Sequence, residues 1–174
     1  MVLDEVTLLR LVWHPFHFGE DGELLATAFD SSDILALPDK DEQPRYISVD
    51  DIELVSQASV DWRIRWQQRD GRREALRRFD AKFVQFTAGR LRECHDTDGH
   101  LLFELTRDPL AEGEDGPESP ENPAHCAVRT NDPLRYSQLP EKKRKQAVMR
   151  IRTQLMKAFT DIITSNQLFP TPNT

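Results

Sequence analysis

An apolar stripe near the C-terminal end of the chain constrains the fold more than any other feature of the sequence. Five residues recur there at intervals of three or four positions: Val148, Ile151, Leu155, Phe159 and Ile162. This spacing places them on one face of an α-helix and predicts a helix over residues 141–165. A helix with one apolar face has to bury that face, so the rest of the chain must supply a surface for it.

Five other segments have the apolar alternation or composition of β-strands: residues 6–13, 24–29, 82–94, 101–107 and 124–130. The dipeptide Asp98-Gly99 favours a tight turn, so residues 79–107 are expected to form a hairpin. Because hairpin connections are short and join antiparallel neighbours, the segments predict a mainly antiparallel sheet.

A second helix is predicted over residues 49–69. Its buried face has five members at helical spacing: Ile52, Val55, Ser59, Trp62 and Trp66. Ser48 followed by Asp51 has the spacing of a capping box, in which side chains satisfy the free N–H groups at a helix start. Ser48 is therefore expected to cap this helix.

These elements predict a single α+β domain over residues 1–174, with a mainly antiparallel sheet of about five strands packed by two longer helices. Residues 30–45 are expected to form a loop with a short helical turn around Ile34. Residues 108–122 hold six acids, two glycines and three prolines, which predicts an acidic mobile loop. Residues 167–174 are expected to form a loose C-terminal tail.

The sequence also indicates in which cellular compartment the protein is located. No apolar run approaches the roughly 20 residues that span a bilayer, and Asp4 and Glu5 make the start acidic where a secretory signal is basic. We therefore expect a cytoplasmic protein with no membrane partner. Cys94 and Cys126 are expected to be reduced thiols in that compartment.

The net charge of −7 hides a strong segregation of acids and bases. Residues 1–60 hold thirteen acids and three bases, whereas residues 61–92 hold ten bases and four acids. Such segments can face each other within one fold or across a homo-oligomer, and they can also steer a partner. By elimination, the leading hypothesis is an intracellular protein-recognition or accessory module whose partner is another protein.

The histidines and cysteines fall into compact groups without forming a metal motif. The candidate ligands are His14, His17, Cys94, His95, His100, His125 and Cys126. The sequence has no Cys-x-x-Cys and no His-Glu-x-x-His, and neighbours such as His125 and Cys126 point to opposite faces of a strand. The sequence therefore predicts neither a metal nor a cofactor.

Arg10 interrupts an otherwise apolar strand, and a buried arginine needs an acceptor. His125 follows the acidic loop at the start of a predicted strand, where side chains often face a cleft. If Arg10 and His125 converge with Ser48 or Asp50, arginine can hold an anion while histidine moves a proton. This arrangement is the alternative hypothesis, a small enzyme acting on a nucleotide or another phosphate-bearing substrate.

Arg10 on the first strand and the later Ser48 are similar to the arginine and serine positions of NAD-binding ADP-ribosyltransferases. The resemblance implies a nucleotide-binding transferase. In that family the serine commonly belongs to a Ser-Thr-Ser run and the acid to a Glu pair, whereas Ser48 here has the position of a helix cap.

A third hypothesis is nucleic-acid binding through a basic surface. The candidate residues near the second helix are Arg63, Arg65, Arg69, Arg72, Arg73, Arg77 and Arg78. The last helix carries further bases that could meet either a protein partner or a nucleic acid: Lys142, Lys143, Arg144 and Lys145. Trp62 and Trp66 could stack on bases, but they lie in the apolar stripe and are expected in the core. The overall acidity also disfavours a phosphate backbone.

The strand over residues 124–130 has a predicted register. We expect Cys126 and Val128 to point into the core and His125 and Arg129 to lie on the polar side, because successive side chains alternate. His125 then faces the acidic loop, and any pocket is expected there with Arg10 as its cation.

Overall fold

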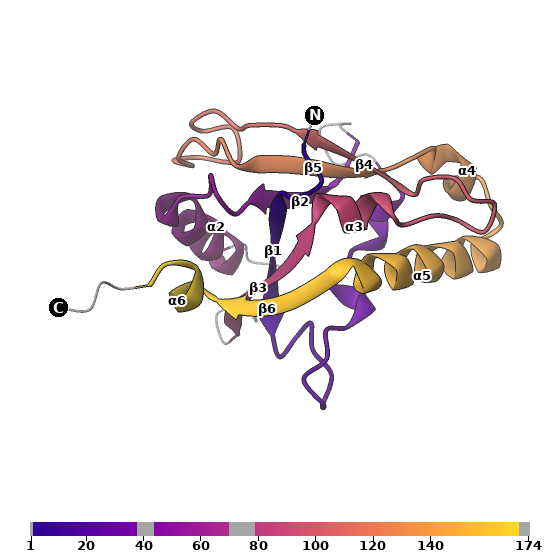
Figure 1. The fold of residues 1–174 in the computed structure, drawn as a ribbon, viewed down its shortest axis with the longest axis horizontal. Coiled ribbons are helices and arrows are strands. Elements are labelled where there is room, and N and C mark those ends of the chain that lie inside the picture. The colour runs from indigo at the N-terminus through magenta and orange to yellow at the C-terminus, as the bar shows by residue number, and fades with distance from the viewer. Residues whose placement is uncertain (1, 38–43, 70–78, 171–174) are drawn as a thin grey trace.

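In the computed structural model, which describes residues 2–37, 44–69 and 79–170, six strands form one antiparallel sheet (Figure 1). In chain order they are β1 (Thr7–His14), β2 (Ile47–Asp51), β3 (Asp80–Thr87), β4 (Phe103–Arg107), β5 (His125–Thr130) and β6 (Phe159–Thr164). Their order in the sheet is β4-β5-β2-β1-β3-β6. The sheet and two long helices form a single α+β domain, which confirms the predicted fold class.

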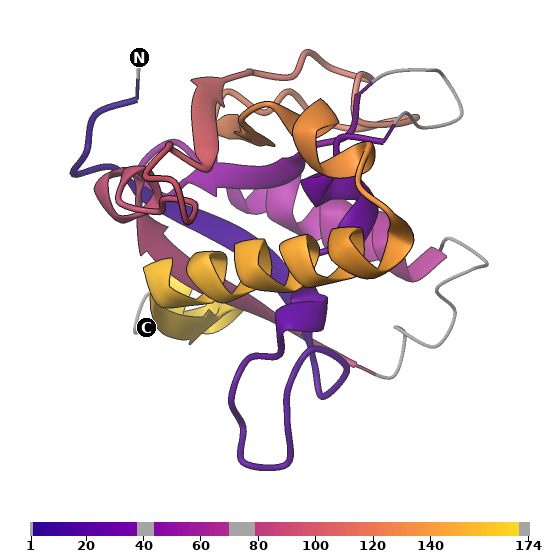
Figure 2. The same ribbon diagram turned by 90° about the vertical axis from the view of Figure 1, so that its right-hand side faces the viewer.

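The two long helices, α2 (Gln57–Arg69) and α5 (Glu141–Ala158), cover opposite faces of the sheet (Figure 2). Five short helical turns complete the described chain, four of them before the last strand and one after it: η1 (Ala26–Ala28), α1 (Ser31–Ile34), α3 (Ala88–Arg92), α4 (Pro133–Ser137) and α6 (Ser165–Leu168). Within the described ranges, none of the helices is both long enough and apolar enough to cross a membrane.

Both faces of the central strand β1 are buried. Leu8 and Val12 belong to the larger core, which also holds Ile151 and Leu155 of α5. Leu9 lies on the opposite face, in a smaller core with Val60 of α2. Because alternate residues of β1 enter different cores, Arg10 shares the α5 face with Leu8 and Val12.

β1 is unevenly paired with its two neighbours. It pairs with β3 along its whole length, from Thr7 to His14. With β2 the register consists of Leu8 opposite Asp51 and Leu9 opposite Asp50. Beyond these pairs the two strands diverge, as Figures 1 and 2 show. The divergence opens the sheet next to Arg10.

The predicted C-terminal helix over residues 141–165 is correct in its first part and wrong in its last. α5 ends at Ala158, and the next six residues form β6. Phe159, Ile162 and Ile163 are aromatic or β-branched residues, which suit a strand. They pair with β3, which would otherwise be the edge of the sheet.

The predicted helix start at Ser48 is wrong. Ser48 lies inside β2, where Ile47 and Val49 are buried in the larger core. The period-two alternation of these residues outweighs the capping-box spacing. The helix begins at Gln57 instead, and Ser56 supplies the hydroxyl that accepts a hydrogen bond from the Ser59 N–H at 3.1 Å.

The predicted hairpin over residues 79–107 is also wrong. β3 pairs with β1 and β6, whereas β4 pairs with β5. The helical turn α3 follows β3 directly and redirects the chain, with the Thr87 hydroxyl accepting from the Arg90 N–H. The turn at Gly99 does form, and its ends meet in an isolated bridge between His95 and Leu101.

Residues 24–29 do not form the predicted strand. Leu24 makes one isolated bridge with Phe18, and the chain then enters η1. β3 pairs along one whole edge of β1, and at the other edge this segment meets β1 through the Arg10 side chain, which donates to the Ala28 carbonyl oxygen, rather than through strand pairing. The helical turn predicted around Ile34 is confirmed as α1.

The segment over residues 108–122 returns to the sheet at both ends. Leu110 and Asn122 form a bridge, and the Gly113 N–H donates to the Ser119 carbonyl oxygen at 2.9 Å. Ser119 and Asn122 are buried. The mobility of this segment stays a prediction. Of the predicted loose tail over residues 167–174, Leu168 and Phe169 pack against the smaller core, and residues 171–174 lie outside the described ranges.

Candidate functional site

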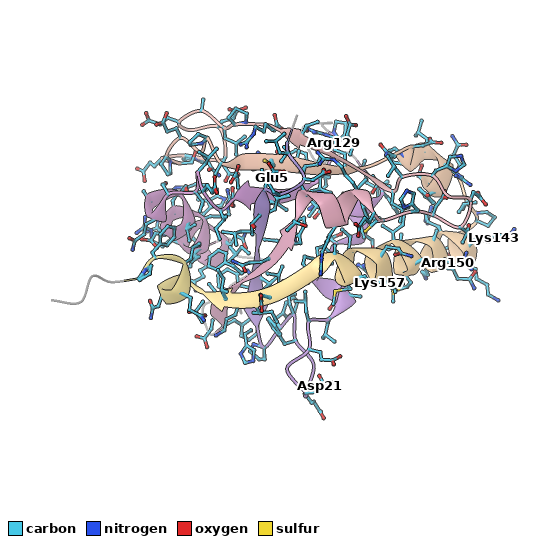
Figure 3. The ribbon with its side chains drawn as sticks, viewed as in Figure 1. Glu5, Asp21, Arg129, Lys143, Arg150 and Lys157 are labelled. Atoms are coloured by element: carbon cyan, nitrogen blue, oxygen red, sulfur yellow. The ribbon has the colours of Figure 1, made fainter. Side chains whose placement is uncertain are left out.

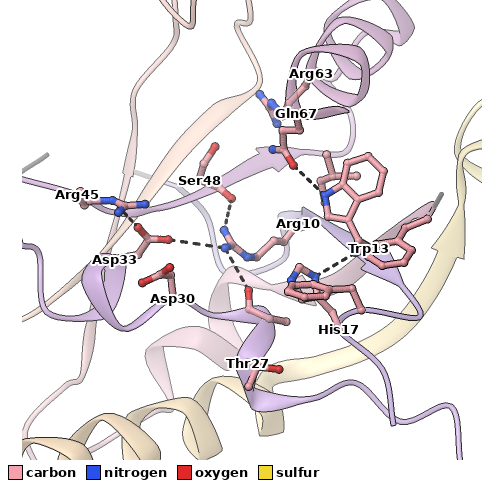
Figure 4. Close-up of a pocket in the computed structure, with 14 residues that line it drawn as sticks. Arg10, Trp13, His17, Thr27, Asp30, Asp33, Arg45, Ser48, Arg63 and Gln67 are labelled. Carbon is pink, nitrogen blue, oxygen red and sulfur yellow. Dashed lines mark hydrogen bonds and ion pairs between the residues drawn. The ribbon is translucent and has the colours of Figure 1, made fainter. Parts of the chain in front are cut away.

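A cleft of about 410 Å³ lies where β1 and β2 diverge (Figure 4). Its walls come from β1, β2, α2 and the segment from η1 to α1. Charged side chains line one end: Arg10, Asp30, Asp33, Arg45 and Arg63. Aromatic side chains line the other: Trp13, Phe16, His17 and Phe79. A volume of several hundred cubic ångströms is typical of a small-molecule site.

Arg10 bridges the opening between the strands. Its Nη1 donates to the main-chain oxygen of Ser48 at 3.1 Å, and its Nη2 donates to that of Ala28 at 3.3 Å. The guanidinium also lies over the ring of Phe29, with 5.3 Å to the centroid. The Arg10 side chain thus joins β1 to β2 beyond the residues that pair in the sheet. The guanidinium has the acceptors that an arginine within an apolar strand was expected to need.

Asp33 joins two cations at the charged end of the cleft. Its Oδ1 lies 2.9 Å from Arg45 Nε, and its Oδ2 lies 3.9 Å from Arg10 Nη2. Asp33 is 9% exposed, and its carboxylate is positioned by α1. Arg45 is the more exposed of the two arginines, so it is the better placed to meet a ligand from solvent.

The aromatic end is held by hydrogen bonds and ring contacts. Trp13 Nε1 donates to Gln67 Oε1 at 2.9 Å, which ties β1 to α2. Phe16 stacks on Phe79 with 5.9 Å between the ring centroids. Phe16 is 58% exposed, so this end presents a flat apolar surface to the cleft mouth.

His125 lies directly behind Ser48. Its Nε2 is 3.0 Å from Ser48 Oγ, and its Nδ1 is 2.6 Å from the main-chain oxygen of Asp108. A carbonyl oxygen only accepts, so Nδ1 carries the proton and Nε2 accepts from the Ser48 hydroxyl. His125 is 1% exposed, and Ser48 stands between it and the cleft.

The predicted candidates Arg10, Ser48 and His125 therefore converge, with Ser48 bonded to both others. The predicted register of β5 is confirmed, since Cys126 and Val128 belong to the larger core. His125 lies on the other face, under the acidic segment as expected, but it is enclosed rather than open to a pocket.

A second cavity of about 760 Å³ adjoins the cleft and shares Arg10, Asp33, Arg45, Ser48 and Gln67 with it. Its remaining charged residues come from β5 and the acidic segment: Asp108, Glu114, Asp115 and Arg129. Burial raises the pKa of Asp115, against the opposing effect of Arg63. Arg129 is held over the ring of Tyr46, with 5.0 Å to the centroid.

Asp50 forms a buried polar cluster beside this site. Arg63 binds both of its carboxylate oxygens, and Asn122 Nδ2 donates to Oδ1 at 2.8 Å. Burial lowers the pKa of Arg63, but the charges and hydrogen bonds of Asp50 and Asp115 together outweigh burial, so the pKa of Arg63 is raised. Arg63 is therefore not on the basic surface where the sequence placed it.

The other predicted basic residues have different surroundings. Arg65 and Arg69 are exposed on α2, while Arg72, Arg73, Arg77 and Arg78 lie outside the described residues. On α5, Lys142, Lys143 and Lys145 are exposed and Arg144 is half-buried. Figure 3 shows Lys143, Arg150 and Lys157 pointing outward from this helix.

The predicted burial of both helix tryptophans is wrong. Trp62 and Trp66 stack with 5.4 Å between centroids, and Trp66 is 41% exposed. Gly116 of the acidic segment lies against this pair, where an added Cβ would come within 3.2 Å of Trp62. The close approach, together with a backbone φ of 140°, favours glycine at this position and places the acidic segment against α2.

The cysteines and histidines do not form a common cluster within the described ranges. Cys94 and Cys126 are both buried thiols, and burial raises the pKa of each to about 11. Asp96, Asp98 and His100 do lie within 4.8 Å of one another. Arg135 already forms ion pairs with both of these aspartates.

The chain was compared with known proteins in three ways. No family model matches it, no curated protein matches its sequence, and no solved structure matches its fold.

Sequence reasoning missed several members of the site. Asp33 and Arg45 were part of a predicted loop, and Trp13, Gln67 and Phe79 were not linked to a cleft. The cluster of Asp50 with Arg63 and Asn122 joins residues up to 72 positions apart. A usable signal was Arg10 itself, because a charge within an apolar strand demands partners.

Proposed function

We propose that this protein binds a small phosphate-bearing molecule with a planar ring, such as a nucleotide, in the cleft between β1 and β2. The observation that carries the proposal is the division of one cleft into a guanidinium end and an aromatic end. A phosphate group fits arginine donors, and a flat ring fits aromatic faces.

The charged end is suited to an anion although it contains acids. Asp33 is shared between Arg45 and Arg10, with the longer contact to Arg10. A phosphate entering beside Arg45 would add acceptors for the remaining N–H groups of that guanidinium, which has five donors in a fixed plane. Arg10 would contribute charge from the floor of the cleft.

The aromatic end supplies the apolar contact. The Phe16 ring is exposed and stacked on Phe79, so it offers one face to solvent without a large rearrangement. The Gln67 amide, already oriented by Trp13, is a polar group that can contact the edge of a ring. Pockets of this type combine apolar walls with a few fixed polar groups.

Calorimetric titration with adenosine monophosphate, adenosine and inorganic phosphate tests the proposal. We expect the monophosphate to bind most tightly. Arg45→Gln should weaken its binding about tenfold or more, since one charge-assisted contact contributes at least about 1.5 kcal/mol. Phe16→Ala should weaken both adenosine and its monophosphate.

The exposed Arg90, which lies on α3, provides a matched control. Arg90→Gln removes the same charge and should leave the affinity unchanged. Equal weakening by Arg45→Gln and Arg90→Gln would show that only net charge matters, and the proposed site would be wrong.

Recognition of an acidic protein is a second candidate function. The exposed bases of α5, including Lys143, Arg150 and Lys157, face away from the domain (Figure 3). Among the described residues, the bases of α5 form one ion pair, between Lys145 Nζ and Glu141 Oε1 at 2.6 Å. The basic face is thus available to steer a partner of opposite charge.

This second function predicts strongly salt-dependent association with a stoichiometric acidic protein, measured by co-purification from the native source at rising salt. Charge reversal of Lys143 and Arg150 should abolish the association. A complex that survives both treatments would be held by another surface.

A further inference from the structure

We propose that Ser48 is a nucleophile, activated by His125, that accepts a phosphoryl group from the ligand bound in the cleft. The choice of a phosphoryl donor rests on the proposed function. The reactivity of Ser48 rests on separate observations.

The first observation is the hydrogen-bond chain behind Ser48. The Asp108 carbonyl oxygen holds the Nδ1 proton at 2.6 Å, which leaves Nε2 as the acceptor of the Ser48 hydroxyl proton at 3.0 Å. A nucleophile, a base and a group that orients the base are the three parts of an activated hydroxyl. Here the orienting group is a main-chain carbonyl.

The second observation is the enclosure of the base. His125 is 1% exposed, and the ring of Tyr46 lies 5.6 Å from its own. Ser48 is half-buried and lines both cavities, whereas His125 is not among the residues that line either of them, so the base reaches the ligand space through Ser48. Enclosure fixes the imidazole and keeps water from competing for its lone pair.

The third observation is that three arginines line the second cavity together with Ser48. Arg10 donates to the carbonyl oxygen of Ser48 itself. Arg45 and Arg129 line the second cavity with Ser48. Each acid of this cavity already has a donor. Asp33 pairs with Arg45, Asp108 with Arg129 and Asp115 with Arg63. Glu114 accepts a hydrogen bond from the Ala111 N–H. Positive charge near a transferring phosphoryl group stabilises its equatorial oxygens.

Ser48, His125 and the ligand account for every bond and proton of the proposed step. Ser48 Oγ forms a bond to phosphorus as its proton moves to His125 Nε2. The bond from phosphorus to the leaving oxygen breaks, and the leaving group takes the electron pair. The imidazolium then returns its proton to that oxygen. Water can afterwards attack the phosphoserine, with His125 again as base.

Diisopropyl fluorophosphate tests the nucleophile directly, because serine displaces fluoride from it and keeps the phosphoryl group. Intact-protein and peptide mass spectrometry should find one added diisopropylphosphoryl group, located on Ser48. Ser48→Ala should abolish labelling, and Ser137→Ala, which removes a half-buried serine of α4, should leave it unchanged. His125→Gln should slow labelling at least about tenfold.

Two checks separate the possible failures. Thermal melting identifies a His125→Gln protein that has lost its fold, and labelling of the wild type at Ser48 stands independently of that variant. Adenosine monophosphate binding without labelling of Ser48 would overturn the nucleophile and leave the proposed function intact. Labelling of Ser48 without nucleotide binding would support the nucleophile and contradict the proposed ligand.

Discussion

Replacing Asp50 with alanine is expected to lower the free energy of unfolding by about 3–5 kcal/mol. Asp50 is 4% exposed and accepts hydrogen bonds from Arg63 and Asn122. Its removal leaves the Arg63 guanidinium buried with Asp115 as its remaining acid, at 3.7 Å. A charge held away from water without close partners is among the largest single costs in a protein interior.

Urea denaturation followed by circular dichroism measures this change. Glu53→Ala is the matched control, because Glu53 lies just beyond β2 and its side chain is exposed. The control should shift the unfolding free energy by less than about 0.5 kcal/mol. A loss below about 1 kcal/mol for Asp50→Ala would mean that Arg63 finds other partners, and the described cluster would not be a stabilising centre.

Replacing Arg10 with methionine is expected to affect both stability and binding. The variant leaves the carbonyl oxygens of Ser48 and Ala28 without their donor and removes the bridge between β1 and β2. We expect a loss of about 2–4 kcal/mol in unfolding free energy, since hydrogen bonds to charged groups contribute about 1.5–3 kcal/mol each. Affinity for adenosine monophosphate should fall at least about tenfold.

Denaturation and calorimetry on the same samples separate these effects. Arg90→Met is the control, since it exchanges an exposed arginine for the same apolar side chain. A variant that folds with normal stability and binds normally would show that Arg10 neither holds the strands together nor serves the ligand.

The clearest periodic patterns in the sequence correctly predicted which residues of a helix or a strand face the core. The stripe at Val148, Ile151 and Leu155 does face the core, and the alternation of Cys126 and Val128 gives the correct register. These patterns work because a helix face or strand face is a local property of the chain. The fold class followed from them.

The errors arose where a distant partner decides the local structure. Residues Phe159 to Thr164 become β6 because β3 offers them an edge, and β3 lies more than 70 positions earlier in the chain. Ser48 and Asp51 have the spacing of a helix cap, but pairing with β5 and β1 places them in a strand. Local propensity is a weak prior against such contacts.

The candidate site was partly predictable for a physical reason. Arg10 and His125 are polar residues within strands, and such residues need partners that can be sought among other polar residues nearby. Their common partner Ser48 was named, although its role as a cap was wrong. The contributions of Asp33, Arg45 and Trp13 depend on how β1 and β2 diverge, which no local pattern encodes.

Nuclear magnetic resonance of the tryptophan indole N–H groups tests the proposed ligand site most directly. The chain has three tryptophans, of which Trp13 lines the cleft, while Trp62 and Trp66 stack beside the acidic segment. On titration with adenosine monophosphate, the Trp13 signal should shift and saturate while the other two stay in place. Saturable shifts of Trp62 and Trp66 with an unmoved Trp13 would contradict the assignment of the cleft as the binding site.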